Sequence, residues 1–229
     1  MTASNPQQNF ERLLEGVSDA PGVEFPENFT VLDHLLFGVV QEGAAPSLAL
    51  EAYKNLVNAF HNFNEMRVAH PTEFAALLDG VSNAEDKAKR MLDILRFVFD
   101  TTYGFDLESM TKKPIKQAQK QLSKVAGATR FAVAATVQRV LGGNAAAIDD
   151  AGREFLIAAG AAEESETLEA LQNRLETILT NENAAPVCLA IQEIAFDPAR
   201  RKAFVAAMGN GEAESKKKAA KKPAKRATN

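Results

Sequence analysis

The sequence is poor in residues that form disulfides or bind metals. It has one cysteine, Cys188, no tryptophan and three histidines among 229 residues. A single cysteine forms no intramolecular disulfide, and with three scattered histidines it offers no ligand set for structural zinc. We therefore expect neither a metal ion nor another cofactor.

Long apolar runs are also missing. No run approaches the roughly 18 residues of a membrane-spanning helix. The first eight residues are mainly polar and lack the basic start and apolar centre of a secretory signal. These absences predict no membrane contact and a cytoplasmic location, on the nucleoid if the protein is bacterial.

The apolar residues that are present follow a helical period. They make up 46% of the chain, against 24% charged residues, which is typical of a globular protein. No sustained alternation of apolar and polar residues indicates a strand. The clearest helix has apolar residues at steps of three and four, namely Ala88, Met91, Leu92, Leu95, Val98 and Phe99. The sequence therefore predicts an all-α fold.

Prolines, glycines and capping residues divide the remaining chain into further helices. The polar run His61–Glu65 is expected to be a turn. The further helices are predicted over Phe29–Val40, from Ser47 to Phe60, from Pro71 to Leu78, from Pro114 to Leu122, over Phe131–Leu141, after Asp149 or Asp150, after Thr167, and over Pro186–Ala207 with a break at Asp197-Pro198.

Positive charge is concentrated at the C-terminal end. Residues Gly211–Asn229 hold seven Lys/Arg and two Glu, although the whole chain has a net charge of -4. The segment has no large apolar side chain, so we expect a disordered tail. Its cations predict sequence-independent contact with nucleic-acid phosphates, or alternatively a solubilising role. They are Lys216, Lys217, Lys218, Lys221, Lys222, Lys225 and Arg226.

Two segments resemble the helix-hairpin-helix DNA glycosylase superfamily, in particular its endonuclease III branch. Phe63–Val68, followed by Pro71 and Glu73, is similar to an asparagine, glutamate, arginine and valine run of that branch, and Val125–Val133 occupies the place of its hairpin. The resemblance implies an all-α, two-lobed fold that binds double-stranded DNA in base-excision repair. One lobe would surround Leu48–Leu141, and the N-terminal and C-terminal helices would form the other.

The resemblance also implies domain limits and a DNA contact. Residues 1–28 would be an N-terminal extension, 29–210 the endonuclease III-like domain and 211–229 the tail. The family's hairpin binds DNA phosphate through backbone N–H groups, so Gly127, Thr129 and Arg130 become candidate DNA-binding residues. Thr129 replaces the second glycine and is expected to resist positive φ, which would weaken the contact. Alternatively, Gly127 only turns one helix into the next.

Of the family's two catalytic groups, this sequence retains one. Phe131 stands where bifunctional members carry the lysine that forms a Schiff base, so strand nicking is disfavoured. Ile148-Asp149 matches the family's catalytic aspartate, which would stabilise positive charge on the deoxyribose. Asp149 is equally suited to be an ordinary helix N-cap.

Two further features of the endonuclease III branch bear on its function here. The four cysteines of its iron-sulfur cluster are absent, so no cluster is expected. Gln41 lies in a plausible region for its base-flipping wedge.

Three functions therefore remain open from the sequence. The first is a monofunctional glycosylase that uses Asp149 and has no lyase activity. The second is a non-enzymatic DNA-binding or chromosome-associated protein on the same fold. The third is a protein-interaction domain with a solubilising tail.

Overall fold

The computed structural model describes residues 5–17 and 23–208. All the regular secondary structure of these residues is helical, which confirms the predicted all-α class. The predicted tail, with the cations from Lys216 to Arg226, lies outside the described residues. Within the described part, no helix is both long and apolar enough to cross a membrane.

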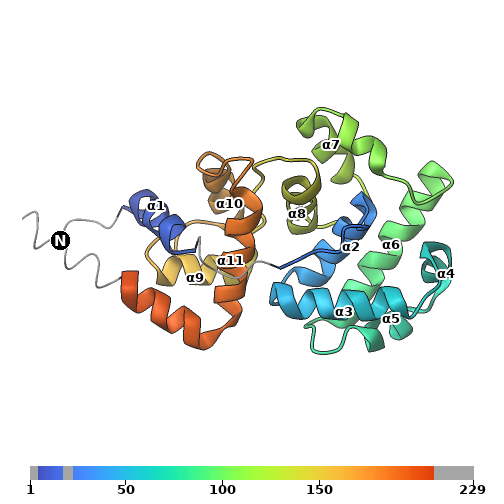
Figure 1. Cartoon of the computed structure of the whole chain (residues 1–229), viewed down its shortest axis with the longest axis horizontal. Coiled ribbons are helices and arrows are strands. Elements are labelled where there is room, and N and C mark those ends of the chain that lie inside the picture. The colour runs from blue at the N-terminus through green and yellow to red at the C-terminus, as the bar shows by residue number, and fades with distance from the viewer. Residues whose placement is uncertain (1–4, 18–22, 209–229) are drawn as a thin grey trace, which may run out of the picture.

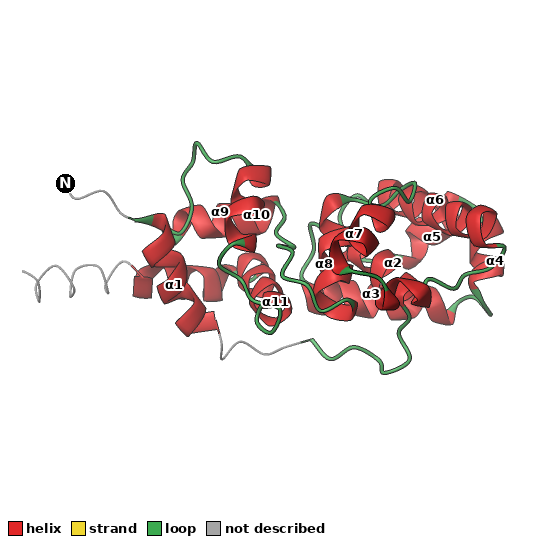
Figure 2. Ribbon diagram, turned by 90° about the horizontal axis from the view of Figure 1, so that it is seen from above, coloured by secondary structure: helices red, strands yellow, loops and turns green. Residues whose placement is uncertain are grey.

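The helices form two lobes that lie side by side (Figures 1 and 2). The larger lobe contains α2 (Val31–Gln41), α3 (Pro46–Asn58), α4 (Phe63–Val68), α5 (Pro71–Leu77), α6 (Ala84–Thr102), the 3-10 helix η1 (Glu108–Lys112), α7 (Ile115–Leu122) and α8 (Arg130–Val140). The smaller lobe contains α1 (Pro6–Val17), α9 (Asp150–Ala158), α10 (Leu168–Glu176), α11 (Ala184–Phe196) and a helix over residues 198–208.

The larger lobe is built around α2, of which every residue is buried. Thr30 starts this helix as a capping box, since its side chain accepts from the Asp33 N–H and the Asp33 carboxylate accepts from the Thr30 N–H at 2.8 Å. The helix packs against α3, α6 and, most extensively, α8. At Gly38 a Cβ atom would lie 2.7 Å from the Ala132 Cα, so this glycine allows α2 and α8 to approach closely.

The two lobes are joined by α11, which contacts α3 and α8 of the larger lobe as well as α1 and α9 of its own. The part of the predicted N-terminal extension that forms α1 packs on α11, with Phe10 and Leu13 completely buried. Both side chains lie one helical turn apart, which gives the polar N-terminal segment its apolar face.

One local expectation was wrong. Residues 63–65 of the polar run begin α4 instead of forming a turn, because the Asn62 side chain accepts from the N–H groups of Asn64 and Glu65 at 3.0 Å. Before α6, the backbone of Asn83 is left-handed (φ 55°) and its side chain makes no capping bond.

Candidate nucleic-acid interface

The predicted hairpin is formed by α7, the turn 123–129 and α8. Gly127 has φ +83°, and a Cβ atom there would lie 2.2 Å from the Arg90 carbonyl oxygen on α6. A side chain is therefore excluded on two grounds, left-handed backbone and lack of space. The close neighbour that requires the glycine belongs to the protein itself, and the glycine seats the hairpin on α6.

Thr129 is the N-cap of α8. Its backbone is extended (φ -90°, ψ 161°), and its hydroxyl accepts from the Ala132 N–H at 3.0 Å. The expected conflict between a branched side chain and positive φ was wrong, because the position does not adopt positive φ. Threonine here begins the helix as a good cap.

Free donors remain at this helix start. Among the described residues, the N–H groups of Gly127, Thr129 and Arg130 donate to no acceptor, whereas the Ala128 N–H donates to Val125 O. Unpaired N–H groups at a helix N-terminus carry partial positive charge and suit an anion. These N–H groups are therefore available to an anion, although the Glu42 carboxylate also lies at this helix start, in contact with the Thr129 side chain.

The Arg130 side chain points to the other lobe. Its Nη1 lies 2.9 Å from Glu169 Oε1, and its Nη2 donates to Asn173 Oδ1 at 2.6 Å, both on α10. This candidate DNA-binding side chain is thus engaged in a contact between the lobes. Its backbone N–H remains available.

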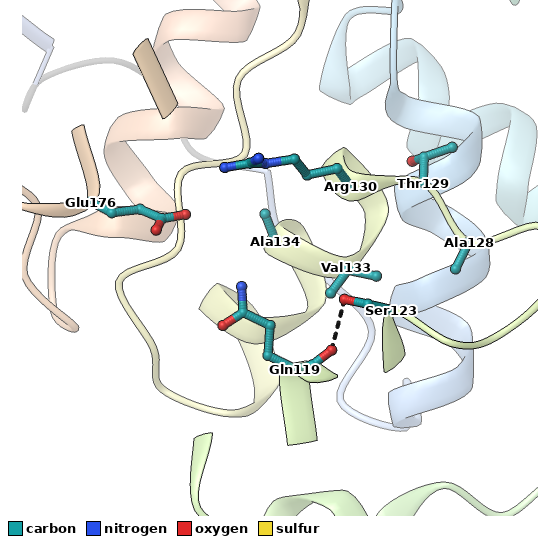
Figure 3. A pocket seen from close by; sticks show the side chains of 8 residues that line it. All are labelled: Gln119, Ser123, Ala128, Thr129, Arg130, Val133, Ala134 and Glu176. Carbon is teal, nitrogen blue, oxygen red and sulfur yellow. Dashed lines mark hydrogen bonds between the residues drawn. The ribbon is translucent and has the colours of Figure 1, made fainter. Parts of the chain in front are cut away.

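A pocket of about 300 Å³ lies beside the hairpin. Figure 3 shows its lining side chains and the hydrogen bond that Ser123 Oγ donates to the Gln119 carbonyl oxygen at 2.9 Å. It is bounded by α7, α8 and the end of α10, through Gln119, Ser123, Ala128, Thr129, Arg130, Val133, Ala134 and Glu176. Asp149 does not line it.

Asp149 is the N-cap of α9 and is 5% exposed. Its Oδ1 accepts from the Gly152 N–H at 2.9 Å. Its Oδ2 accepts from the Gly43 N–H at 2.9 Å and from Gln192 Nε2 at 2.8 Å. Three protein donors therefore satisfy a carboxylate that is closed off from solvent.

Asp149 ends a chain of side-chain hydrogen bonds that we call the interlobe relay. Arg139 Nη2 donates to Gln41 Oε1, Gln41 Nε2 donates to Gln192 Oε1, and Gln192 Nε2 donates to Asp149. Arg139 and Gln41 belong to the larger lobe, and Gln192 and Asp149 to the smaller. Because arginine only donates and a carboxylate only accepts, the two ends fix the orientation of both amides.

The relay gives Gln41 a buried place. Gln41 is 1% exposed, and Gln192 also donates to its backbone carbonyl at 3.1 Å. The guanidinium of Arg139 lies 4.9 Å from the ring centres of Phe25 and Phe37. A side chain held between the lobes in this way is not placed to enter a DNA duplex.

Two further residues of the candidate site, Phe131 and Lys87, are also buried. Phe131 is 2% exposed in the core of the larger lobe. Lys87 is 6% exposed and donates to the Val40 carbonyl oxygen at 2.8 Å. Burial lowers the pKa of Lys87 to about 8, although the carboxylates of Glu42 and Asp149 act in the opposite direction. The described residues contain no group of three or more His, Cys, Asp or Glu side chains that could hold a metal ion.

Sequence reasoning missed Lys87, Gln192 and Arg139. Lys87 lies four residues before Met91, in phase with the buried face of α6, and Gln192 interrupts the apolar sequence of α11. A polar residue in phase with a buried face is a usable signal. It reveals that a residue is buried, but not which residue lies opposite.

The fold and the hairpin define the class of protein to which this chain is similar. No known protein family and no curated protein matches its sequence. Its fold is that of the helix-hairpin-helix DNA glycosylases.

Three solved structures carry this likeness. One is a trapped endonuclease III–DNA covalent intermediate, with a TM-score of 0.63, 15% identity, and coverage of 82% of this chain and 85% of the other. The second is a thermostable thymine-DNA glycosylase, with a TM-score of 0.63, 15% identity, and coverage of 90% and 94%. The third is the H. pylori 3-methyladenine DNA glycosylase bound to 1,N6-ethenoadenine, with a TM-score of 0.53, 15% identity, and coverage of 89% and 98%.

Proposed function

We propose that this chain binds double-stranded DNA through its hairpin and catalyses neither strand nicking nor base excision. The observation that carries the proposal is the set of unpaired N–H groups at Gly127, Thr129 and Arg130. They stand at the start of α8, where the helix dipole favours an anion. The glycosylase fold around them supports DNA as the source of that anion.

The contacts of the catalytic candidates favour a binding role over chemistry. Phe131 offers no nucleophile and is buried. The Asp149 carboxylate is occupied by three donors, two of which join it to Gly43 and Gln192. A deoxyribose needs direct access to a catalytic carboxylate, and a flipped base needs an open pocket. Asp149 in this arrangement serves the fold.

A monofunctional glycosylase is the second candidate, and the position of Asp149 favours it. The carboxylate lies at the junction of the lobes, and one of its partners is the N–H of Gly43 in the short turn between α2 and α3. Movement of this turn would remove one of the two donors that hold Oδ2. Such a glycosylase would release a base without cutting the strand.

The proposal also gives a role to the domain as a whole, to the N-terminal extension and to the tail. Residues 29–210 form the DNA-binding domain, to which α1 of the extension 1–28 adds a packed helix. The tail 211–229 adds a salt-dependent phosphate contact through Lys216–Arg226. This tail strengthens binding without adding sequence preference.

A matched pair of variants at Arg130 tests the hairpin. Proline suits the first position of a helix and follows extended residues well, so Arg130→Pro removes the N–H without disturbing α8. Arg130→Ala loses the same side chain and keeps the N–H. In fluorescence anisotropy with a labelled duplex, we expect Arg130→Pro to bind at least about fivefold more weakly than Arg130→Ala, which corresponds to roughly 1 kcal/mol. Equal affinities would contradict the hairpin contact.

Single-turnover incubation with duplexes carrying a panel of damaged bases separates the two candidates. Each reaction is analysed with and without alkali. We expect no strand breaks in either case. Alkali-dependent breaks that disappear in Asp149→Asn, with folding confirmed by circular dichroism, would establish the monofunctional glycosylase instead.

A further inference from the structure

Residues 109–148 are free of acidic side chains. This stretch contains seven Lys/Arg and no Asp or Glu, although the whole chain has 30 acidic residues. It covers α7, the hairpin turn and α8. Arg130 pairs with Glu169 and Arg139 belongs to the buried relay, so the five lysines of the stretch are the cations that can form a local positive surface.

Two of these lysines share one face of α7, and a third follows in the turn after it. Lys116 and Lys120 are four residues apart in the helix, and Lys124 follows four residues later. The C-cap Ser123 keeps helical backbone angles (φ -67°, ψ -11°), so the path of the chain continues to Lys124. Residues four apart lie on the same side of a helix. We call Lys116, Lys120 and Lys124 the α7 lysine stripe.

The stripe faces solvent and is not neutralised. All three lysines are exposed, while Ala118 and Leu122 on the same helix are buried. Among the described residues, none of the three side chains makes an ion pair or hydrogen bond. By contrast, Lys113 donates to Gln121 at 2.6 Å.

Helix stability does not account for this arrangement. Like charges four residues apart destabilise a helix by a few tenths of a kcal/mol. A cation near the C-terminus of α7 would offset the helix dipole, but Lys116 is its second residue, where positive charge is unfavourable. An anionic ligand along the whole row explains both positions.

The stripe lies on the part of the helix surface next to the one that faces the pocket. Gln119 and Ser123, one residue before Lys120 and Lys124, line the pocket of about 300 Å³ together with Thr129 (Figure 3), and consecutive residues of a helix are turned by about 100°. Along the helix axis the three lysines span about 12 Å, at 1.5 Å per residue. Phosphates of one DNA strand advance about 3.4 Å each along the duplex axis, so the row matches about three to four of them.

We propose that the α7 lysine stripe binds the sugar–phosphate backbone of a DNA strand that continues from the hairpin. The inference rests on the proposed DNA-binding function and adds the direction in which the strand leaves. The ligand groups are successive phosphates of one strand. The stripe is therefore a second contact, separate from the N–H groups of the hairpin turn.

The test compares two triple variants of the full chain with equal net charge. The first is Lys116→Gln/Lys120→Gln/Lys124→Gln, and its control replaces three exposed lysines of α3, α6 and helix 198–208, Lys54→Gln/Lys89→Gln/Lys202→Gln. Duplex affinity is measured by anisotropy between roughly 50 and 200 mM salt. Thermal unfolding checks that both variants are folded.

We expect the stripe variant to lose at least about tenfold in affinity relative to the control, and its salt slope to fall by about 2 to 3, at about 0.9 for each phosphate contact. Equal affinities and slopes in the two triple variants, with wild-type binding intact, would overturn the stripe and leave the proposed function standing. Absence of duplex binding by the wild-type chain at the lowest salt would overturn both. A stripe-dependent preference for single-stranded RNA over duplex DNA would overturn DNA as the ligand.

Discussion

Replacement of Asp149 by asparagine tests how strongly the three donors around its carboxylate stabilise the fold. The introduced amide keeps one acceptor and gains a donor. With its oxygen toward Gly152 it retains the cap, but its Nδ2 then meets the donors of Gly43 and Gln192. With the amide turned over, its Nδ2 meets the Gly152 N–H. Either orientation leaves donor facing donor in a buried place.

The expected loss in the free energy of unfolding follows from the hydrogen bonds that the substitution removes. Hydrogen bonds to a charged acceptor contribute about 1.5–3 kcal/mol each. In the better orientation the amide oxygen keeps the bonds from Gly43 and Gln192, and the bond from Gly152 is lost. We therefore expect Asp149→Asn to lower the free energy of unfolding by about 2 kcal/mol.

The control is Asp150→Asn at the exposed neighbouring carboxylate, with an expected loss of about 0.5 kcal/mol. Both are measured by urea denaturation. A loss below about 1 kcal/mol in Asp149→Asn would refute this reasoning, because it would show that the site tolerates a donor in place of one carboxylate oxygen.

Three other predictions concern the core and the hairpin. Burial and then the charge of Arg139 lower the pKa of His34 from 6.5 to about 4. The unfolded chain therefore binds the proton first as pH falls, and stability is lost between pH 6.5 and about 4. Between pH 7 and pH 5, urea unfolding should show wild type losing about 2 kcal/mol more than His34→Phe. Gly127→Ala should lower the free energy of unfolding by more than about 2 kcal/mol, and Gly142→Ala, which also has positive φ but open space, by about 1. Phe131→Lys should cost more than about 3 kcal/mol without allowing borohydride capture of abasic DNA, whereas Phe131→Leu should cost about 1. Capture by a stably folded Phe131→Lys would show that the position reaches DNA.

The sequence predicted the fold where local rules decide it. The apolar positions from Ala88 to Phe99 became α6, and Thr167 caps α10 by accepting from the Ala170 N–H at 3.2 Å. Both features depend on residues within a few positions of each other. The missed helix α4 also obeys a local rule, since Asn62 is its N-cap, but the polar run obscured it.

Local sequence rules could not predict the contacts of the candidate site. Gln41 and Gln192 are 151 residues apart, and Arg139 and Gln41 are 98 apart. Spacing predicts which residues share a helical face, but it does not predict which faces meet after folding. The sequence therefore identified Asp149 as either a catalyst or a cap without indicating that it also ends a relay between the lobes.

Charge and burial are divided between two regions of this molecule. At the lobe junction, two amides connect the guanidinium of Arg139 with the buried carboxylate of Asp149, while Arg139 Nε and Nη1 are buried without a hydrogen-bond partner among the described residues. Along α7, the cations stay exposed and unpaired, so their charge is available to a ligand. A buried relay is sensitive to single substitutions, since each of its side chains has a fixed partner. The exposed lysines have no such partner, so they can be replaced without disturbing the contact that holds the lobes together.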